Sequence, residues 1–126
     1  AGRWLTEPQL SPSLKSLRTR ALQHGVVVPT LFRYEVTNLL VTYSRFVGDS
    51  ALDRSIAAIQ SWPVTIDLRT PHLEDHVNLA LTTGLSAYDA TYVELAQRLD
   101  LPLATADTKL GKAAKKLGIK VLGLPK

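Results

Sequence analysis

The feature that most constrains the fold is the alternation of helical apolar periodicity with short, almost wholly apolar segments. Such segments are typical of strands buried on both faces of a parallel sheet. Four of them are expected to be strands: Val26–Val28, Val64–Leu68, Leu101–Thr105 and Ile119–Leu122. Helices that alternate with buried strands predict an α/β sandwich with a mainly parallel central sheet.

Capping residues, prolines and glycines predict where the helices begin and end. The expected helices run from Ser11-Pro12 to His24, from Thr30 to about Val47, from Ala51 to Trp62, from Thr70-Pro71 to about Thr83, from Ser86 to about Leu99, and from Asp107 to Leu117. In open α/β sheets, ligands bind beyond the carboxyl ends of the strands. The residues just after each strand are therefore the first place to look for chemistry.

Composition narrows the class of protein. A chain of 126 residues is long enough for one domain with its own core. It has no apolar run long enough to span a membrane, and without cysteine it can form neither disulfides nor zinc–thiolate sites. The net charge is +4, with six lysines after residue 108, which suits a polyanion such as nucleic acid but also fits an ordinary solvated helix.

Three acidic residues stand out by position. Glu35 lies in the helix after the first strand, Asp89 in the first turn of the helix that Ser86 begins, and Asp107 directly after the Leu101–Thr105 strand. Each also has a structural interpretation. Glu35 could be a solvated side chain, Asp89 the reciprocal partner of Ser86 in a capping box, and Asp107 a helix N-cap.

Clustered carboxylates would bind a hard cation such as Mg²⁺ or Mn²⁺. Such an ion acidifies and orients water and stabilises a leaving oxygen, so phosphodiester hydrolysis needs no side-chain nucleophile. His72 and His76 share a helix face, but no third ligand accompanies them, so a histidine metal site is disfavoured.

Three segments resemble the acid motifs of PIN domains of the VapC type. They are Val28-Pro29-Thr30-Leu31-Phe32-Arg33-Tyr34-Glu35-Val36-Thr37-Asn38-Leu39-Leu40, Leu85-Ser86-Ala87-Tyr88-Asp89-Ala90-Thr91-Tyr92-Val93-Glu94-Leu95-Ala96, and Pro102-Leu103-Ala104-Thr105-Ala106-Asp107-Thr108-Lys109-Leu110. Their order and spacing fit the family, and the resemblance covers almost the whole chain.

The resemblance implies a PIN-like (Rossmann-like) α/β/α sandwich and Mg²⁺- or Mn²⁺-dependent cleavage of RNA by an endoribonuclease toxin. It further implies cytoplasmic localisation, a homodimer and a VapB-type antitoxin that occupies the active-site groove. Glu35, Asp89 and Asp107 would be the metal-binding and catalytic acids. The supporting residues would be Thr105, Asn38 and Ser86, with Arg33 and Lys109 as candidate contacts to substrate phosphates.

The N-terminal end of the sequence departs from the family pattern. Residues 1–8 resemble the segment that comes after the family's first strand and first acid, so residues 1–126 would be a single PIN domain lacking that strand. Truncation of a longer native chain is the favoured explanation, because loss of a central strand would leave a large gap in the core. Two other functions stay open: a PIN-like module that binds RNA or protein without cleaving, and a PIN nuclease of RNA processing.

Overall fold

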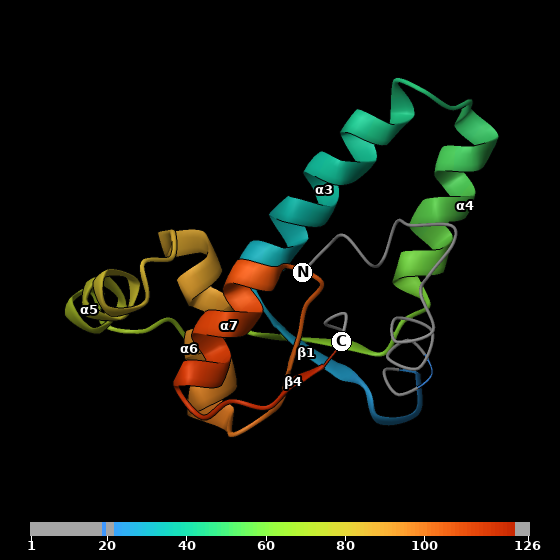
Figure 1. Ribbon diagram of the computed structural model, residues 1–126. Helices are drawn as coiled ribbons and strands as arrows, with labels where there is room; N and C mark the ends of the chain where they lie inside the picture. The colour runs from blue at the N-terminus through green and yellow to red at the C-terminus, as the bar shows by residue number, and fades with distance from the viewer. Residues whose placement is uncertain (1–18, 20–21, 123–126) are drawn as a thin grey trace.

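The structure is a computed structural model that describes residue 19 and residues 22–122. Helices predominate over short strands in this part of the chain (Figure 1). The elements are β1 (Val26–Pro29), α3 (Leu31–Ser44), α4 (Asp49–Gln60), β2 (Val64–Asp67), α5 (Leu73–Thr83), α6 (Ala87–Leu99), β3 (Leu103–Ala104), α7 (Thr108–Lys116) and β4 (Val121–Leu122). No helix among the described residues is both long and apolar enough to cross a bilayer.

The strands pair in parallel, as the sequence predicts. In one pair, Val26 of β1 lies opposite Val64 of β2. In the other, Leu103 of β3 lies opposite Val121 of β4. Within the described residues these are two separate two-stranded sheets. Helix α6 contacts both β1 and β3 and so connects the two pairs.

Parallel strands need a long crossover because a tight turn cannot join them. The helices α3 and α4 supply the crossover between β1 and β2, and they project from the strands as a hairpin (Figure 1). Helix α7 supplies the crossover between β3 and β4. Gly25 has a φ of 81°, and a Cβ there would meet the Pro63 carbonyl oxygen at 3.3 Å. A glycine therefore lets the chain entering β1 approach the start of β2 closely.

The buried side chains form two hydrophobic clusters. The larger, here called the α6–α7 cluster, contains Leu85, Ala90, Tyr92, Val93, Ala96, Leu103, Leu110 and Ala114. The smaller, here called the α3 cluster, contains Val28, Phe32 and Val36, with Val26, Leu40, Ile59 and Val64 packed against it. Helix α4 has no fully buried residue, so it covers the α3 cluster from outside.

Most predicted element positions are confirmed, with several differences. Helix α4 runs from Asp49 to Gln60 instead of from Ala51 to Trp62. Thr30 precedes α3 but its side chain makes no cap hydrogen bond. The helix predicted to open at Thr70-Pro71 begins at Leu73, after His72 in an extended conformation. The cap prediction at Thr70 was wrong because the helix starts where Glu74 and Asp75 can occupy its first turn, which favours acidic side chains. Helix α3 ends at Ser44 instead of Val47. The helix predicted from Ser11 lies mostly outside the described residues, apart from a helical stretch at 22–24.

Candidate active site

Glu35 lies in the second turn of α3, at the boundary between the two clusters. Its neighbours Phe32 and Val36 are buried against β1, which fixes the rotation of the helix. Glu35 itself is half-buried. One of its carboxylate oxygens accepts a hydrogen bond from the hydroxyl of Tyr92 on α6. The side chain is therefore anchored to a second helix and is not simply a solvated glutamate.

Asp89 lies in the first turn of α6 and is half-buried. The predicted cap is confirmed, since Ser86 Oγ accepts a hydrogen bond from the Asp89 N–H at 3.1 Å. Within residues 22–122 no hydrogen bond returns from the Ser86 N–H to the Asp89 carboxylate. The capping box is thus only half formed, and the cap holds the Asp89 backbone while leaving its carboxylate oxygens available.

Tyr92 is the residue that sequence reasoning missed, because its apolar spacing on α6 assigned it to the core. It is 7% exposed and belongs to the α6–α7 cluster. Burial raises the pKa of the Tyr92 hydroxyl far above its usual range, and the hydrogen bond to Glu35 and the charges of Glu35 and Asp89 raise it further. Tyr92 therefore stays protonated, and its O–H donates the hydrogen bond to the Glu35 carboxylate. Its position three residues after Asp89, on the same helix face, was the signal available in the sequence.

The Tyr92 hydrogen bond places Glu35 of α3 beside the helix that carries Asp89. Asp89 lies one turn before Tyr92 on the same face of α6, and its charge also raises the pKa of the Tyr92 hydroxyl. Their oxygen donors suit a hard divalent cation, because Mg²⁺ takes one or two carboxylates and completes its shell with water and phosphate oxygens. The residues present at this point therefore fit the ion that the sequence implies.

Asp107 has the structural role that its alternative interpretation gives it. Its Oδ1 accepts a hydrogen bond from the Leu110 N–H at 3.1 Å, which caps α7. Thr105 is fully buried, and its Oγ1 accepts from the Asp107 N–H at 3.0 Å. No hydrogen bond or ion pair in residues 22–122 joins Asp107 to Glu35 or Asp89. Among the described residues, no three Asp, Glu, His or Cys side chains are arranged so that they could hold one metal ion.

The remaining predicted site residues lie at the surface. Asn38 follows Glu35 by one turn of α3, Arg33 lies in the first turn of that helix, and Lys109 begins α7 beside Asp107; all three are exposed. His76, disfavoured as a metal ligand, has its Nε2 2.8 Å from the Ala87 carbonyl oxygen. This contact connects α5 to the first turn of α6, next to Asp89.

Comparisons with known proteins find a family and several similar chains. The family model described as PIN domain matches residues 5–116. Two curated relatives, both named Ribonuclease VapC1, from Mycobacterium tuberculosis strains CDC 1551 / Oshkosh and ATCC 25618 / H37Rv, are 38% identical over 63 residues, which is 48% of this chain and 47% of each relative. The chain thus spans about half the length of the curated relatives it matches.

A solved structure shares the fold. The crystal structure of PAE2754 from Pyrobaculum aerophilum superposes with a TM-score of 0.62 at 23% sequence identity, covering 86% of this chain and 81% of that one. At this identity the likeness concerns the fold alone.

Proposed function

This chain belongs to the PIN-domain family, and on that premise we propose that it is a divalent-metal-dependent endoribonuclease of the VapC toxin type. The observation that carries the proposal is the hydrogen bond from the buried Tyr92 hydroxyl of α6 to Glu35 of α3, which brings Glu35 to the face of α6 that carries Asp89 one turn before Tyr92. Supporting it, the relatives that match half of the chain are named ribonucleases.

In this proposal Glu35 and Asp89 hold Mg²⁺ or Mn²⁺, with Asp107 as a third acid. The bound ion would make water more acidic and stabilise the leaving oxygen of the phosphodiester. The chain's own residues position the acids. Tyr92 fixes one oxygen of Glu35, Ser86 fixes the backbone of Asp89, and Thr105 fixes that of Asp107. No side-chain nucleophile is required.

Substrate and partners form the finer part of the proposal. Arg33 and Lys109 are exposed cations close in the chain to Glu35 and Asp107, so they are the proposed contacts to RNA phosphates. Asn38, one turn beyond Glu35, is a proposed polar contact to the substrate or to bound water. The resemblance to VapC proteins adds a homodimer, a VapB-type antitoxin and a cytoplasmic location to the proposal.

The test is RNA cleavage by the full-length native chain, free of antitoxin, with Mg²⁺ or Mn²⁺ and with or without a chelator. Glu35→Gln and Asp89→Asn should each lower the cleavage rate by about 100-fold or more while the fold remains, because each removes one charged ligand of the ion. Asp53→Asn, an exposed acid of α4, is the matched control and should cleave normally.

The outcomes separate the candidate functions. Chelator-sensitive cleavage that is lost in both site variants supports the nuclease. Cleavage that survives both substitutions would show that these acids are structural. Binding of RNA without cleavage across a broad panel would identify the non-cleaving binding module instead.

A further inference from the structure

Helix α6 carries two tyrosines one turn apart on the same face. Tyr92 is 7% exposed and donates its hydroxyl to Glu35. Tyr88 is 67% exposed, and its hydroxyl makes no hydrogen bond within residues 22–122. Residues four apart in a helix lie above one another. The ring of Tyr88 therefore extends the face of α6 from the Tyr92–Glu35 contact towards solvent.

The backbone groups of the residues before and after Tyr88 are both held by hydrogen bonds. The Ser86 side chain accepts from the Asp89 N–H at 3.1 Å. The Ala87 carbonyl oxygen lies 2.8 Å from His76 Nε2 and accepts from Thr91 Oγ1 at 2.9 Å. These contacts fix the first turn of α6, and a fixed turn presents an aromatic ring without a large loss of entropy when a ligand binds.

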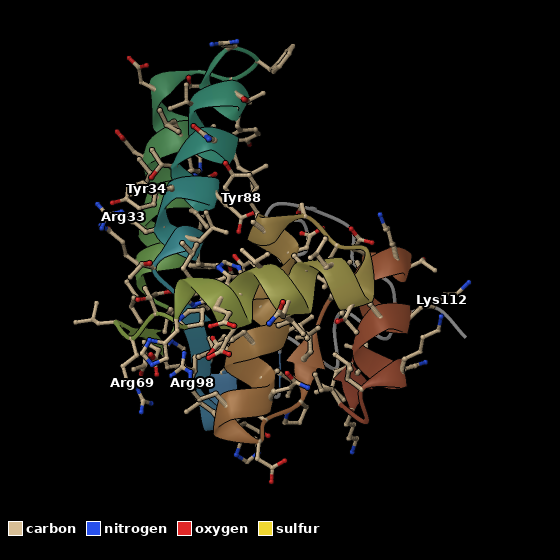
Figure 2. The ribbon with its side chains drawn as sticks, turned by 90° about the vertical axis from the view of Figure 1, so that its left-hand side faces the viewer. Arg33, Tyr34, Arg69, Tyr88, Arg98 and Lys112 are labelled. Carbon is tan, nitrogen blue, oxygen red and sulfur yellow. The ribbon has the colours of Figure 1, made fainter. Side chains whose placement is uncertain are left out.

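Figure 2 shows Tyr88 at the end of α6 that lies beside α3, the helix that carries Glu35. Tyr88 lies one turn before Tyr92, whose hydroxyl donates to Glu35, so its exposed ring lies on the face of α6 that meets Glu35. A ring with an apolar face and a polar edge is suited to contact a flat ligand. The Glu35 and Asp89 carboxylates cannot contact the flat face of a ligand in this way, because in the proposed function they bind the metal ion, which in turn binds a phosphate.

We propose that Tyr88 is a base-binding residue, whose ring stacks on an unpaired RNA base next to the phosphate at the Glu35–Asp89 pair. The inference rests on the proposed function and assigns to Tyr88 a contact with the substrate that no acid of the site can make. Proteins read unpaired RNA largely by stacking its splayed bases on aromatic side chains. Stacking on one ring tolerates any base, so Tyr88 selects single strands over duplexes and does not set a sequence.

The first experiment measures binding of a short fluorescent single-stranded RNA to the full chain, with chelator present so that no cleavage occurs. Tyr88→Leu keeps an apolar side chain but removes the aromatic face, and it should weaken binding by about 5- to 100-fold. Tyr88→Phe and Tyr88→Trp should bind within about 3-fold of the parent. Because the side chain is exposed, all three variants should unfold at the parent's temperature.

A second experiment separates stacking from a general surface effect. RNAs that lack one base at successive positions are tested against the parent and Tyr88→Leu. At the stacked position the parent should lose about as much affinity as Tyr88→Leu loses with intact RNA, and Tyr88→Leu should lose nothing more. Tyr34→Leu is the matched control. Tyr34 is 68% exposed and precedes Glu35 directly, but it projects about 100° away from Glu35 around α3.

Each result decides the proposal. Weak binding in Tyr88→Leu alone, coupled to one missing base, supports it. Unchanged binding in Tyr88→Leu, while the parent cleaves RNA, overturns the base-binding role and leaves the nuclease standing. Equal losses in Tyr88→Leu and Tyr34→Leu without coupling to a missing base also overturn it. A parent that neither binds nor cleaves RNA overturns both proposals together.

Discussion

The two hydrophobic clusters of this domain differ in how completely they are enclosed. The α6–α7 cluster has eight buried residues drawn from α6, β3, α7 and the turn before α6. The α3 cluster has three buried residues, and its cover, α4, has none. Beyond the α3 cluster the α3–α4 hairpin exposes Phe46, which is 81% accessible. The half of the domain around the α6–α7 cluster is therefore a closed core. The half around the α3 cluster is a small core from which the α3–α4 hairpin projects.

The difference matters because the candidate site lies where the two halves meet. Glu35 is on the helix of the α3 cluster, whereas Asp89 and Tyr92 are on the helix of the α6–α7 cluster. Besides the packing of α6 against β1, two polar side-chain contacts of the described residues cross this boundary: the Tyr92–Glu35 hydrogen bond, and an ion pair of 3.2 Å between Arg98 of α6 and Asp67 of β2. The distance between the two acids thus depends on how the halves are joined.

The same substitution made in each half should give the largest contrast. Leu110→Ala removes a side chain that is 2% exposed in the α6–α7 cluster and should lower the free energy of unfolding by about 2–5 kcal/mol. Leu40→Ala removes a half-buried leucine at the α3 cluster and should cost less than about 2 kcal/mol, because less of the cavity is enclosed. Urea denaturation followed by circular dichroism measures both. Equal losses would show that the two clusters are one core energetically.

Removing the buried contact between the halves should have the next largest effect. Tyr92→Phe deletes only the hydroxyl that donates to Glu35 and should cost about 1–3 kcal/mol, since the acceptor is charged. It should also lower RNA cleavage, because Glu35 loses its fixed orientation. Tyr88→Phe is the control of identical chemistry on an exposed ring, and its stability should match the parent. If Tyr92→Phe were as stable as the parent, the Tyr92–Glu35 hydrogen bond would contribute nothing to joining the two halves.

The local features of this fold could be read from the sequence, and the boundary contacts could not. Val26–Val28, the Ser86 cap and the Asp107 cap depend on neighbouring residues, and all three were predicted correctly. The Tyr92–Glu35 contact joins residues 57 positions apart, so no local pattern reports it. Chain order singled out Glu35, Asp89 and Asp107 by their places after strands and at helix starts, and the resemblance to PIN domains gave them a common role; that role stays a prediction.

The two halves should also differ in their attraction for RNA. Helix α7 bears Lys109, Lys112 and Lys116 on one exposed face, and Figure 2 shows Lys112 projecting into solvent. Replacing these three by glutamine should reduce the slope of log binding constant against log salt by about 2, if all three contact phosphates of a single strand. Arg45→Gln with Arg54→Gln, on the α3–α4 hairpin, should leave the slope nearly unchanged. Titrations of RNA binding at several salt concentrations give both slopes, and equal changes would assign the charge effect to the whole surface.

The smallest expected effect belongs to the second contact across the boundary. Arg69 donates to Asp67 from its side chain and its backbone, and together with Arg98 it lowers the pKa of Asp67 from 3.8 to about 2. A carboxylate with a depressed pKa stabilises the folded state above its unfolded pKa, and this contribution disappears as the pH falls through its folded pKa. The stability difference between the parent and Asp67→Asn should therefore be constant above about pH 4 and vanish near pH 2.

This stability difference should be small and shrink in high salt, because Arg69 is exposed and surface ion pairs are screened. Urea denaturation of both proteins between pH 2 and 7 measures it, and a difference larger than that of Tyr92→Phe would make the Asp67 carboxylate, and not the buried hydroxyl, the larger polar contribution to stability.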